Sequence, residues 1–224
     1  MLKYCSGMIL VRFFRKVLTN FVIKVTKGMN VPFDFFSVEK KDTVPEKGKV
    51  LISEPFLRDE YFKRSIVLLA EYGDKGALGF VLNKPVKMTV NKLVKGFPAT
   101  DIPVFLGGPV STNTLHYIHT LGDFMTGSKR IFGEIYWGGD FETMKKLVEQ
   151  GVATSKNVRF FVGYSGWDAG QLERELSENS WVIARLNMKQ VMMGNDHEIW
   201  KKVLRNLGRK YKLWADFPEN PGLN

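Results

Sequence analysis

Cysteine and histidine are scarce in this chain of 224 residues, which has one cysteine, Cys5, and three histidines. A lone cysteine cannot form a disulfide within the chain, so nothing indicates an oxidising compartment, and we expect a cytoplasmic protein. His116 and His119 lie three residues apart in a predicted strand, which places them on opposite faces, and His197 stands by itself. No second soft ligand accompanies these groups, so we expect no metal site and no cofactor.

Long apolar runs are also missing. Residues 8–11 form an apolar run that Arg12 ends, and residues 21–23 form one that Lys24 ends. A secretory signal needs an unbroken run of about 7–15 apolar residues, and a membrane-spanning helix needs about 20. We therefore expect neither a signal peptide nor a transmembrane segment.

The positive charge is concentrated at the N-terminus. Residues 1–28 contain six basic and no acidic side chains, and without them the net charge falls from +10 to +4. The body of the chain is therefore only mildly basic, which weakens a nucleic-acid interpretation based on charge alone. We favour translation from Met29, with residues 1–28 as a start-site artefact or a disordered basic extension and residues 29–224 as the domain. A basic amphipathic helix over residues 10–25, lying on a membrane surface, is the alternative.

The body has the composition of a globular domain. Hydrophobic residues make up 44% of the chain and charged residues 25%, and the length suffices to bury a core. The apolar run at 65–70 predicts a strand buried on both faces, and the segment from Gly73 to Gly76 predicts a hairpin turn. The short run at 50–52 stops before Pro55, which predicts a strand end or an edge strand. No linker or repeat divides the body, so we expect a single α+β domain.

Strands and helices alternate through the rest of the body. Thr89 and Asp140 stand where helix N-caps are expected, and Asp168 and Asn195 each precede Gln or Glu by three residues, as in a capping box. The final helix is expected to end before Gly208. The predicted strands cover residues 50–52, 65–70, 77–82, 104–106, 115–120, 130–137, 158–162 and 181–186, and the predicted helices cover 89–95 and 141–150 and begin at residues 168 and 195.

The densest candidate for chemistry is the glycine-rich segment 163–170, between a predicted strand and a predicted helix. A nucleophile elbow would need glycine two residues on either side of Ser165, but the second of these positions is Trp167. A phosphate cradle at the helix start is the second interpretation, although the segment lacks the lysine of a P-loop. In the simplest interpretation the glycines allow a tight reversal and Trp167 fills the core beneath it. We expect no catalytic residue here.

A second glycine-rich turn, Gly107-Gly108-Pro109, follows a predicted strand and offers close backbone approach to a ligand. Basic side chains elsewhere in the chain could serve as partners for an anion. The residues of this small-ligand hypothesis, with phosphate or a nucleotide as the ligand, are Gly107, Gly108, Gly163, Gly166, Gly170, Arg64 and Lys84.

The last predicted helix and its tail are rich in basic residues. Lys201, Arg205 and Arg209 are our candidates for contacts to nucleic-acid phosphates. A solvated face beside an apolar stripe is the alternative interpretation of the same residues. No helix-turn-helix or other module that reads base sequence is recognisable.

Five segments occur in the order of a known family: Leu-Ile-Ser-Glu-Pro at 51–55, Phe-Lys-Arg-Ser at 62–65, Gly-Ala-Leu-Gly-Phe-Val-Leu-Asn-Lys-Pro at 76–85, Leu-Gly-Gly-Pro-Val at 106–110 and Gly-Tyr-Ser-Gly-Trp-Asp-Ala-Gly-Gln-Leu-Glu at 163–173. Together they resemble the bacterial YqgE/AlgH family over about residues 29–224. The resemblance implies a compact α+β fold with a mixed, barrel-like sheet and flanking helices. It brings no catalytic residues, and members often have alanine at the position of Ser165.

Two functional hypotheses follow. Some members of the family carry the label of transcriptional regulator, so the first is a non-enzymatic cytoplasmic protein that acts through contacts to another protein or to DNA. The second is a small-ligand binding protein or enzyme that uses the glycine-rich turns.

Overall fold

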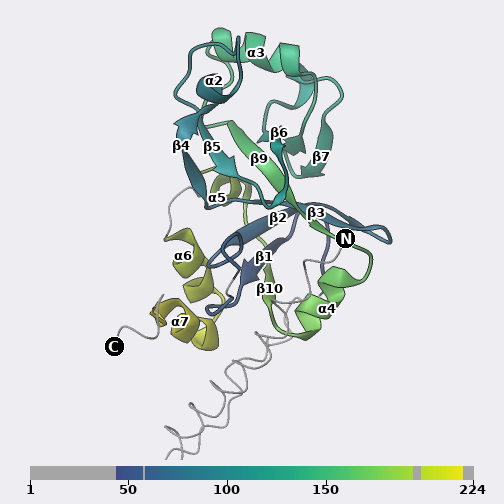
Figure 1. Cartoon of the computed structure of the whole chain (residues 1–224), viewed down its shortest axis with the longest axis vertical. Helices are drawn as coiled ribbons and strands as arrows, with labels where there is room; N and C mark the ends of the chain where they lie inside the picture. The colour runs from purple at the N-terminus through teal and green to yellow at the C-terminus, as the bar shows by residue number, and fades with distance from the viewer. Residues whose placement is uncertain (1–43, 58, 194–197, 219–224) are drawn as a thin grey trace, which may run out of the picture.

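The computed structural model describes residues 44–57, 59–193 and 198–218 (Figure 1). The predictions for residues 1–28, Cys5, Asn195 and His197 lie outside these residues. Within them the chain is α+β, as predicted, with ten strands in one branched sheet and helices packed against it. The strands are β1 (Val50–Ser53), β2 (Ile66–Gly73), β3 (Gly76–Val81), β4 (Pro85–Thr89), β5 (Pro103–Leu106), β6 (Val110–His119), β7 (Lys129–Phe132), β8 (Ile135–Trp137), β9 (Val158–Trp167) and β10 (Trp181–Ala184).

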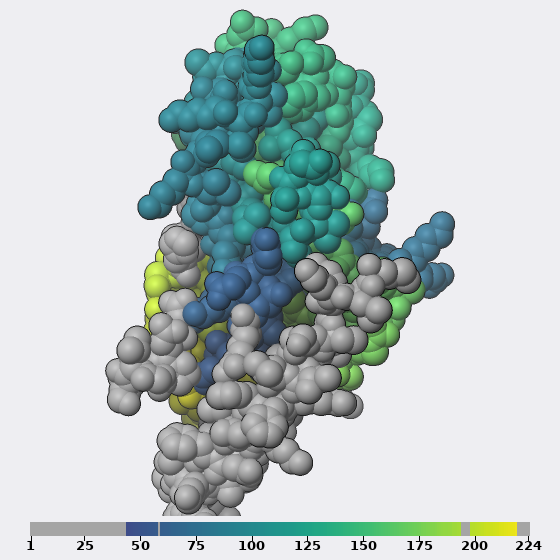
Figure 2. Space-filling view, viewed as in Figure 1, coloured from purple at the N-terminus to yellow at the C-terminus, as the bar shows by residue number. Residues whose placement is uncertain are grey.

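The helices lie between and after these strands. They are α2 (Val90–Leu93), α3 (Phe141–Glu149), α4 (Gln171–Ser177), α5 (Met188–Met193), α6 (Ile199–Asn206) and α7 (Arg209–Asp216), with one 3₁₀ turn, η1 (Gly122–Phe124). In Figure 1, α2 and α3 lie at the top beside β4 to β8, whereas α4, α6 and α7 lie below, around β1 and β10. Figure 2 shows the turn between β2 and β3 projecting from the side of the molecule.

The long strand β9 joins the two halves of the sheet. Its last residues pair with β3, and its earlier residues pair with β6 and, in parallel, with β5. The main path runs β10-β1-β2-β3-β9-β6-β8-β7, so the sheet is mixed, as the resemblance implied. The barrel-like expectation is wrong, because the path ends at β10 and β7 and the sheet does not close. The two halves of the sheet pair with different ends of β9. The sheet therefore divides at this strand and does not curve round to close on itself.

Strand β2 confirms the prediction of a strand buried on both faces. Ile66 and Leu68 belong to the core cluster that lies under α5, α6 and α7. Val67 and Leu69 belong to a second cluster, which lies under α4. Because side chains alternate along a strand, one apolar run serves both cores. A third cluster joins β5, β6 and β9 to α2 and α3.

Strand β1 ends before Pro55, as one of the two alternatives predicted, but it is not an edge strand, and that alternative is wrong. It lies between β10 and β2 and pairs with both, and its residues are all buried. The last residue of its ladder is Ser53, paired with Trp181. Pro55 comes after that pair, so its missing N–H removes no hydrogen bond from the sheet.

Two further predictions need correction. The strand predicted at 130–137 is the hairpin β7–β8, turned at Gly133 with a φ of +50°. Helix α2 is shorter than predicted, and the hydroxyl of its N-cap residue, Thr89, bonds Oδ1 of Asn91 at 2.7 Å and caps no backbone N–H. By contrast, Asp140 caps α3 as predicted: its Oδ2 accepts from the backbone N–H of Thr143 at 2.7 Å, and this bonding lowers the pKa of Asp140.

The C-terminal region forms two helices where one was predicted. Gly208, with a φ of +128°, separates α6 from α7. The basic run after Gly208 was predicted to be a tail, but its Tyr211, Trp214 and Ala215 are buried in the core cluster under the sheet. Together α6 and α7 form a helical hairpin, called the α6–α7 hairpin below. Helix α5 also had no counterpart among the predicted elements.

Candidate functional site

The two glycine-rich segments pack directly on each other. A Cβ at Gly107 would lie 2.3 Å from the carbonyl oxygen of Gly163, and one at Gly108 would lie 2.4 Å from the carbonyl oxygen of Tyr164. Gly163 itself has a φ of +65°. Only glycine allows two backbones to approach this closely, so the structure gives these residues a packing role. Binding of a ligand at these glycines stays a prediction.

The glycine-rich segment 163–170, predicted to form a tight reversal, continues strand β9 as far as Trp167. Ser165 is fully buried, and its Oγ donates to the carbonyl oxygen of Gly107 at 3.0 Å. Trp167 lies in the core under α4, as predicted. The turn comes later, at Gly170, which takes the N-cap position of α4 with a φ of +73°. Gly166 lies in the strand, and a Cβ there would lie 3.3 Å from the Tyr164 ring.

A different set of predicted residues meets in a hollow of about 190 Å³, which we call the basic pocket. Its walls come from the segments before β2 and after β3 and from the beginning of α6. Arg64 and Lys84, predicted as anion partners, lie there together with Lys201, predicted as a nucleic-acid contact. The pocket is lined by Lys63, Arg64, Asn83, Lys84, Glu198, Trp200 and Lys201.

Asn83 fixes the sheet side of the basic pocket. Its Oδ1 accepts from the backbone N–H of Ile66 at 2.9 Å, and its Nδ2 donates to the carbonyl oxygen of Arg64 at 2.8 Å. These bonds tie the segment before β2 to the segment after β3. Arg64 is held there with a φ of +51°, a conformation that non-glycine residues rarely adopt. No sequence pattern indicated this role for Asn83.

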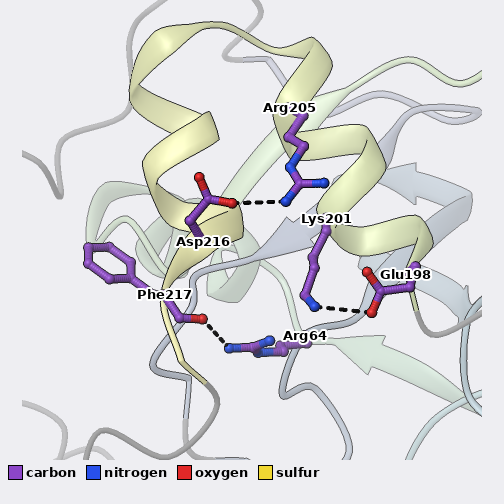
Figure 3. A network of polar contacts seen from close by, with 6 residues as sticks. All are labelled: Arg64, Glu198, Lys201, Arg205, Asp216 and Phe217. Carbon is purple, nitrogen blue, oxygen red and sulfur yellow. Dashed lines mark hydrogen bonds and ion pairs between the residues drawn. The ribbon is translucent and has the colours of Figure 1, made fainter. Parts of the chain in front are cut away.

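The guanidinium of Arg64 reaches the α6–α7 hairpin. Its Nη2 donates to the carbonyl oxygen of Phe217 at 2.7 Å (Figure 3), and its Cζ lies 5.1 Å from the centroid of the Trp200 ring. Trp200 is fully buried, and its indole N–H donates to the carbonyl oxygen of Ser53 at 3.0 Å. Trp200 is therefore a fixed part of the wall.

The remaining cations of the pocket also have polar contacts. Nζ of Lys84 donates to the carbonyl oxygen of Glu60 at 3.2 Å, and Nζ of Lys201 lies 3.0 Å from Oε1 of Glu198. Figure 3 shows the end of Lys201 turned toward Arg64, below α6. Four basic side chains thus share the described walls with one carboxylate, and all four are half-buried. Partial burial strengthens their field relative to that of cations surrounded by water.

The three predicted nucleic-acid contacts have different surroundings. Lys201 lines the basic pocket, and Arg205 pairs with Asp216 across the α6–α7 hairpin, with 2.9 Å between Nη2 and Oδ1 (Figure 3). Arg209 is exposed at the beginning of α7. Their contact with nucleic acid stays a prediction.

Comparison with known proteins decides the family. A sequence model described as AlgH-like (DUF179) matches residues 50–212. This chain belongs to the AlgH-like family. The UPF0301 protein of Bacteroides thetaiotaomicron is 42% identical over 197 residues, which cover 88% of this chain and all of that protein. The UPF0301 protein of Chlorobium luteolum is 42% identical over 177 residues, which cover 79% of this chain and 94% of that protein. The resemblance to the YqgE/AlgH family is confirmed.

Solved structures share the fold. The solution structure of AlgH from Pseudomonas aeruginosa is 25% identical, with a TM-score of 0.62, and the match covers 77% of this chain and 94% of that one. An X-ray structure of a Corynebacterium diphtheriae protein is 21% identical, with a TM-score of 0.64, and the match covers 78% of this chain and 93% of that one. The second likeness concerns the fold alone.

The two described histidines of this AlgH-like chain lie on opposite faces of β6, as predicted. His119 is fully buried: its Nδ1 accepts from the backbone N–H of Leu121 at 3.2 Å, and its Nε2 lies 2.9 Å from the carbonyl oxygen of Gly138. Burial lowers the pKa of His119, and the bond to Gly138 opposes this shift only in part. Burial also lowers the pKa of His116, whose ring contacts Phe80, Trp137 and Tyr164.

A buried arginine in β9 was missed by the sequence analysis. Arg159 is 2% exposed, donates to the carbonyl oxygens of Leu82 and Val191, and lies 4.1 Å from the centroid of the Phe105 ring. Burial lowers the pKa of Arg159 to about 9. Its bonds tie β9 to the end of β3 and to α5. The sequence feature that could have indicated this role is a lone basic residue within the apolar run of the strand predicted at 158–162.

The described residues contain neither a cluster of metal ligands nor a helix that could span a membrane. No group of three or more His, Cys, Asp or Glu side chains that could hold a metal ion occurs among them. Within the same part of the chain, every helix is too short or too polar to cross a membrane.

Proposed function

We propose that this AlgH-like protein is a non-enzymatic binding protein whose basic pocket takes a small anion with phosphate-type oxygens. The observation that carries the proposal is the convergence of Lys63, Arg64, Lys84 and Lys201 on one hollow, where Glu198 is the one carboxylate among the described lining residues. Basic side chains gathered around a hollow attract an anion to it. The sequence spreads these residues over more than 130 positions, and the fold brings them together.

The chemistry of the walls supports a phosphate-type anion. A guanidinium offers paired N–H donors that match phosphate oxygens, and lysine ammonium groups add compact charge. The volume of about 190 Å³ is below that of sites for drug-sized ligands. Trp200 is buried and its N–H is already bonded, so it offers no face on which a nucleobase could stack. A free phosphate or a phosphate monoester therefore suits the pocket better than a nucleoside does.

The absence of a catalytic step is part of this proposal. The hydroxyl that the sequence motif points to, that of Ser165, is buried and donates to the carbonyl oxygen of Gly107. Asn83, the neutral polar residue of the pocket, has both ends of its amide bonded to backbone. Neither Ser165 nor Asn83 therefore offers a free group that would attack or protonate a bound ligand.

Isothermal titration calorimetry tests the proposal. The full chain is titrated with inorganic phosphate and with pyrophosphate in buffers whose ionic strength is matched with chloride. Lys84→Ala is expected to weaken binding about tenfold, because it removes one charge-assisted hydrogen bond of about 1.5 kcal/mol. Lys87→Ala is the matched control, since Lys87 is exposed on β4 and lies outside the pocket. Glu198→Gln is expected to tighten binding. Absence of binding by either anion, or equal losses in K84A and K87A, would contradict the proposal.

Contact with nucleic acid, in a cytoplasmic regulator of transcription, is the second candidate. It is favoured by the exposed basic side chains of the α6–α7 hairpin, among them Arg205 and Arg209. Charge reversal of Lys201, Arg205 and Arg209 together should then weaken binding to duplex DNA and flatten its dependence on salt. Fluorescence anisotropy over a salt series measures both quantities. Unchanged binding by the triple variant would remove this candidate.

A further inference from the structure

His119, at the end of β6, joins its strand to two other segments through the two nitrogens of its ring. Its Nδ1 lies 3.2 Å from the backbone nitrogen of Leu121, at the beginning of η1, and its Nε2 lies 2.9 Å from the carbonyl oxygen of Gly138, just after β8. A backbone N–H can only donate and a carbonyl oxygen can only accept. Nδ1 therefore carries a lone pair and Nε2 carries the proton, so the two partners fix the neutral imidazole in one tautomer.

A second proton on the ring is incompatible with one of these two bonds. It would bind to Nδ1, and the new N–H would then point at the N–H of Leu121. The bond to Gly138 suits both forms of the ring, because Nε2 donates in each. His119 is fully buried, so water does not reach the ring to replace the lost partner. Protonation thus breaks the contact with Leu121 and leaves the contact with Gly138.

The groups around the ring leave this proton to His119. The titratable and charged residues on the elements packed against it are Tyr117, Asp123, Tyr136, Asp140 and Arg159. The two tyrosine rings lie 6.0 and 5.8 Å from the imidazole, and phenols are ordinarily neutral below pH 8. Asp123 is exposed, Asp140 is bound to the N–H of Thr143, and Arg159 lies against Phe105 and Phe161 on the other face of β9. Of these groups, histidine is the one that ordinarily titrates between pH 5 and pH 8.

The turn that His119 contacts covers part of the core. Leu121 and Met125 are buried in the cluster under α2 and α3, whereas Phe124 between them is 66% exposed. We infer that His119 is a pH-sensitive contact, which holds the η1 turn on β6 while the imidazole is neutral and releases the N–H of Leu121 when a second proton binds. This inference goes beyond the proposed function and does not depend on the basic pocket.

A nuclear magnetic resonance titration of the full chain between pH 4.5 and pH 8 tests the contact. Burial holds the pKa of His119 below 6.5, and the amide signal of Leu121 should change with the same midpoint as the imidazole signal. Protection of the Leu121 amide against hydrogen exchange should fall by up to about tenfold per pH unit from pH 6.5 down to that midpoint, because one proton is taken up. The Thr143 amide is the internal control, since its acceptor is the carboxylate of Asp140, and its signal should stay in place.

Two histidines of one strand give a matched pair of variants. His119→Gln replaces the ring by an amide that does not titrate, so the change at Leu121 should disappear. His116→Gln, on the opposite face of β6, should keep it. A Leu121 signal that stays constant while His119 titrates in the unmodified chain would overturn the inference, whether or not H119Q folds, and so would an unaltered Leu121 titration in H119Q. Loss of all native signals at the midpoint would also overturn it, because the proton would then unfold the domain and not release one contact.

Discussion

At the junction of β5 and β9, backbone lies on backbone, with Gly107 and Gly108 against Gly163 and Tyr164 and no side chain between them. The basic pocket is made the other way, from long charged side chains on segments far apart in the sequence. The junction has no freedom, because any added atom would collide with a carbonyl group. The walls of the pocket come from two parts of the fold and carry four basic side chains. The densest sequence motif thus serves the fold, and scattered residues form the site.

Substitution at the junction should have the largest effect. In Gly108→Ala the new Cβ would lie 2.4 Å from the Tyr164 backbone, and φ is +153°. We expect a loss of at least about 3 kcal/mol in the free energy of unfolding, or no folded protein, since neither backbone can withdraw. Gly151→Ala is the control: φ is +70° but the space is open, and we expect a loss of about 1 kcal/mol. Urea unfolding measures both. Similar losses in the two variants would show that backbone contact at the junction does not matter.

Acid is expected to lower the free energy of unfolding through His119, which lies in the half of the sheet that contains the glycine junction. Burial holds the pKa of folded His119 below its ordinary value of 6.5, so below pH 6.5 the unfolded chain binds a proton that the folded chain refuses. The contribution is complete above pH 6.5 and is lost as the pH falls from there toward the folded pKa. The slope for one proton is at most about 1.4 kcal/mol per pH unit.

The measurement is the free energy of unfolding by urea between pH 5 and pH 8. His119→Gln should flatten the dependence more than His116→Gln, because His119 is fully buried and its Nδ1 must accept from Leu121. Equal slopes for both variants and the unmodified chain would assign the acid sensitivity to other groups.

Local rules explain what could be predicted. The apolar run that became β2 and the cap at Asp140 depend on neighbours in the sequence, and both predictions are confirmed. Helix α7 was missed because Gly208 and the basic residues after it resemble an exposed tail, whereas its Trp214 and Tyr211 find a core made by β1 and β2. The edge prediction for β1 failed for the same reason, since its partner β10 lies more than 120 residues away.

The basic pocket was predictable only in parts. Arg64, Lys84 and Lys201 were candidates on the basis of charge, but for two different ligands. The two backbone hydrogen bonds of Asn83 and the packing of α6 against the sheet bring these three residues together. Neither feature produces a local pattern in the sequence. The glycines were recognised as positions of close approach, but the approaching group is another strand.

A smaller effect separates packing from chemistry at Ser165. Ser165→Ala removes one buried hydrogen bond to the carbonyl oxygen of Gly107, which also accepts from the backbone N–H of Val81. Because the carbonyl keeps that partner, we expect a loss of only about 1 kcal/mol, with phosphate binding unchanged. Thermal unfolding and calorimetry measure the two quantities. A large loss of binding with little loss of stability would move the site from the basic pocket to the junction.

The smallest effect is expected at the exposed ion pair of the α6–α7 hairpin. Arg205 and Asp216 form an ion pair between side chains that are 52% and 61% exposed, so water and salt screen it. Arg205→Ala should therefore lower the free energy of unfolding by less than about 1 kcal/mol, and 0.5 M salt should remove most of the difference. Urea unfolding at low and high salt tests this, with Lys202→Ala as the control on the same helix. A loss of several kcal/mol that persists in high salt would mean that the pair is not screened and stabilises the hairpin as a buried contact would.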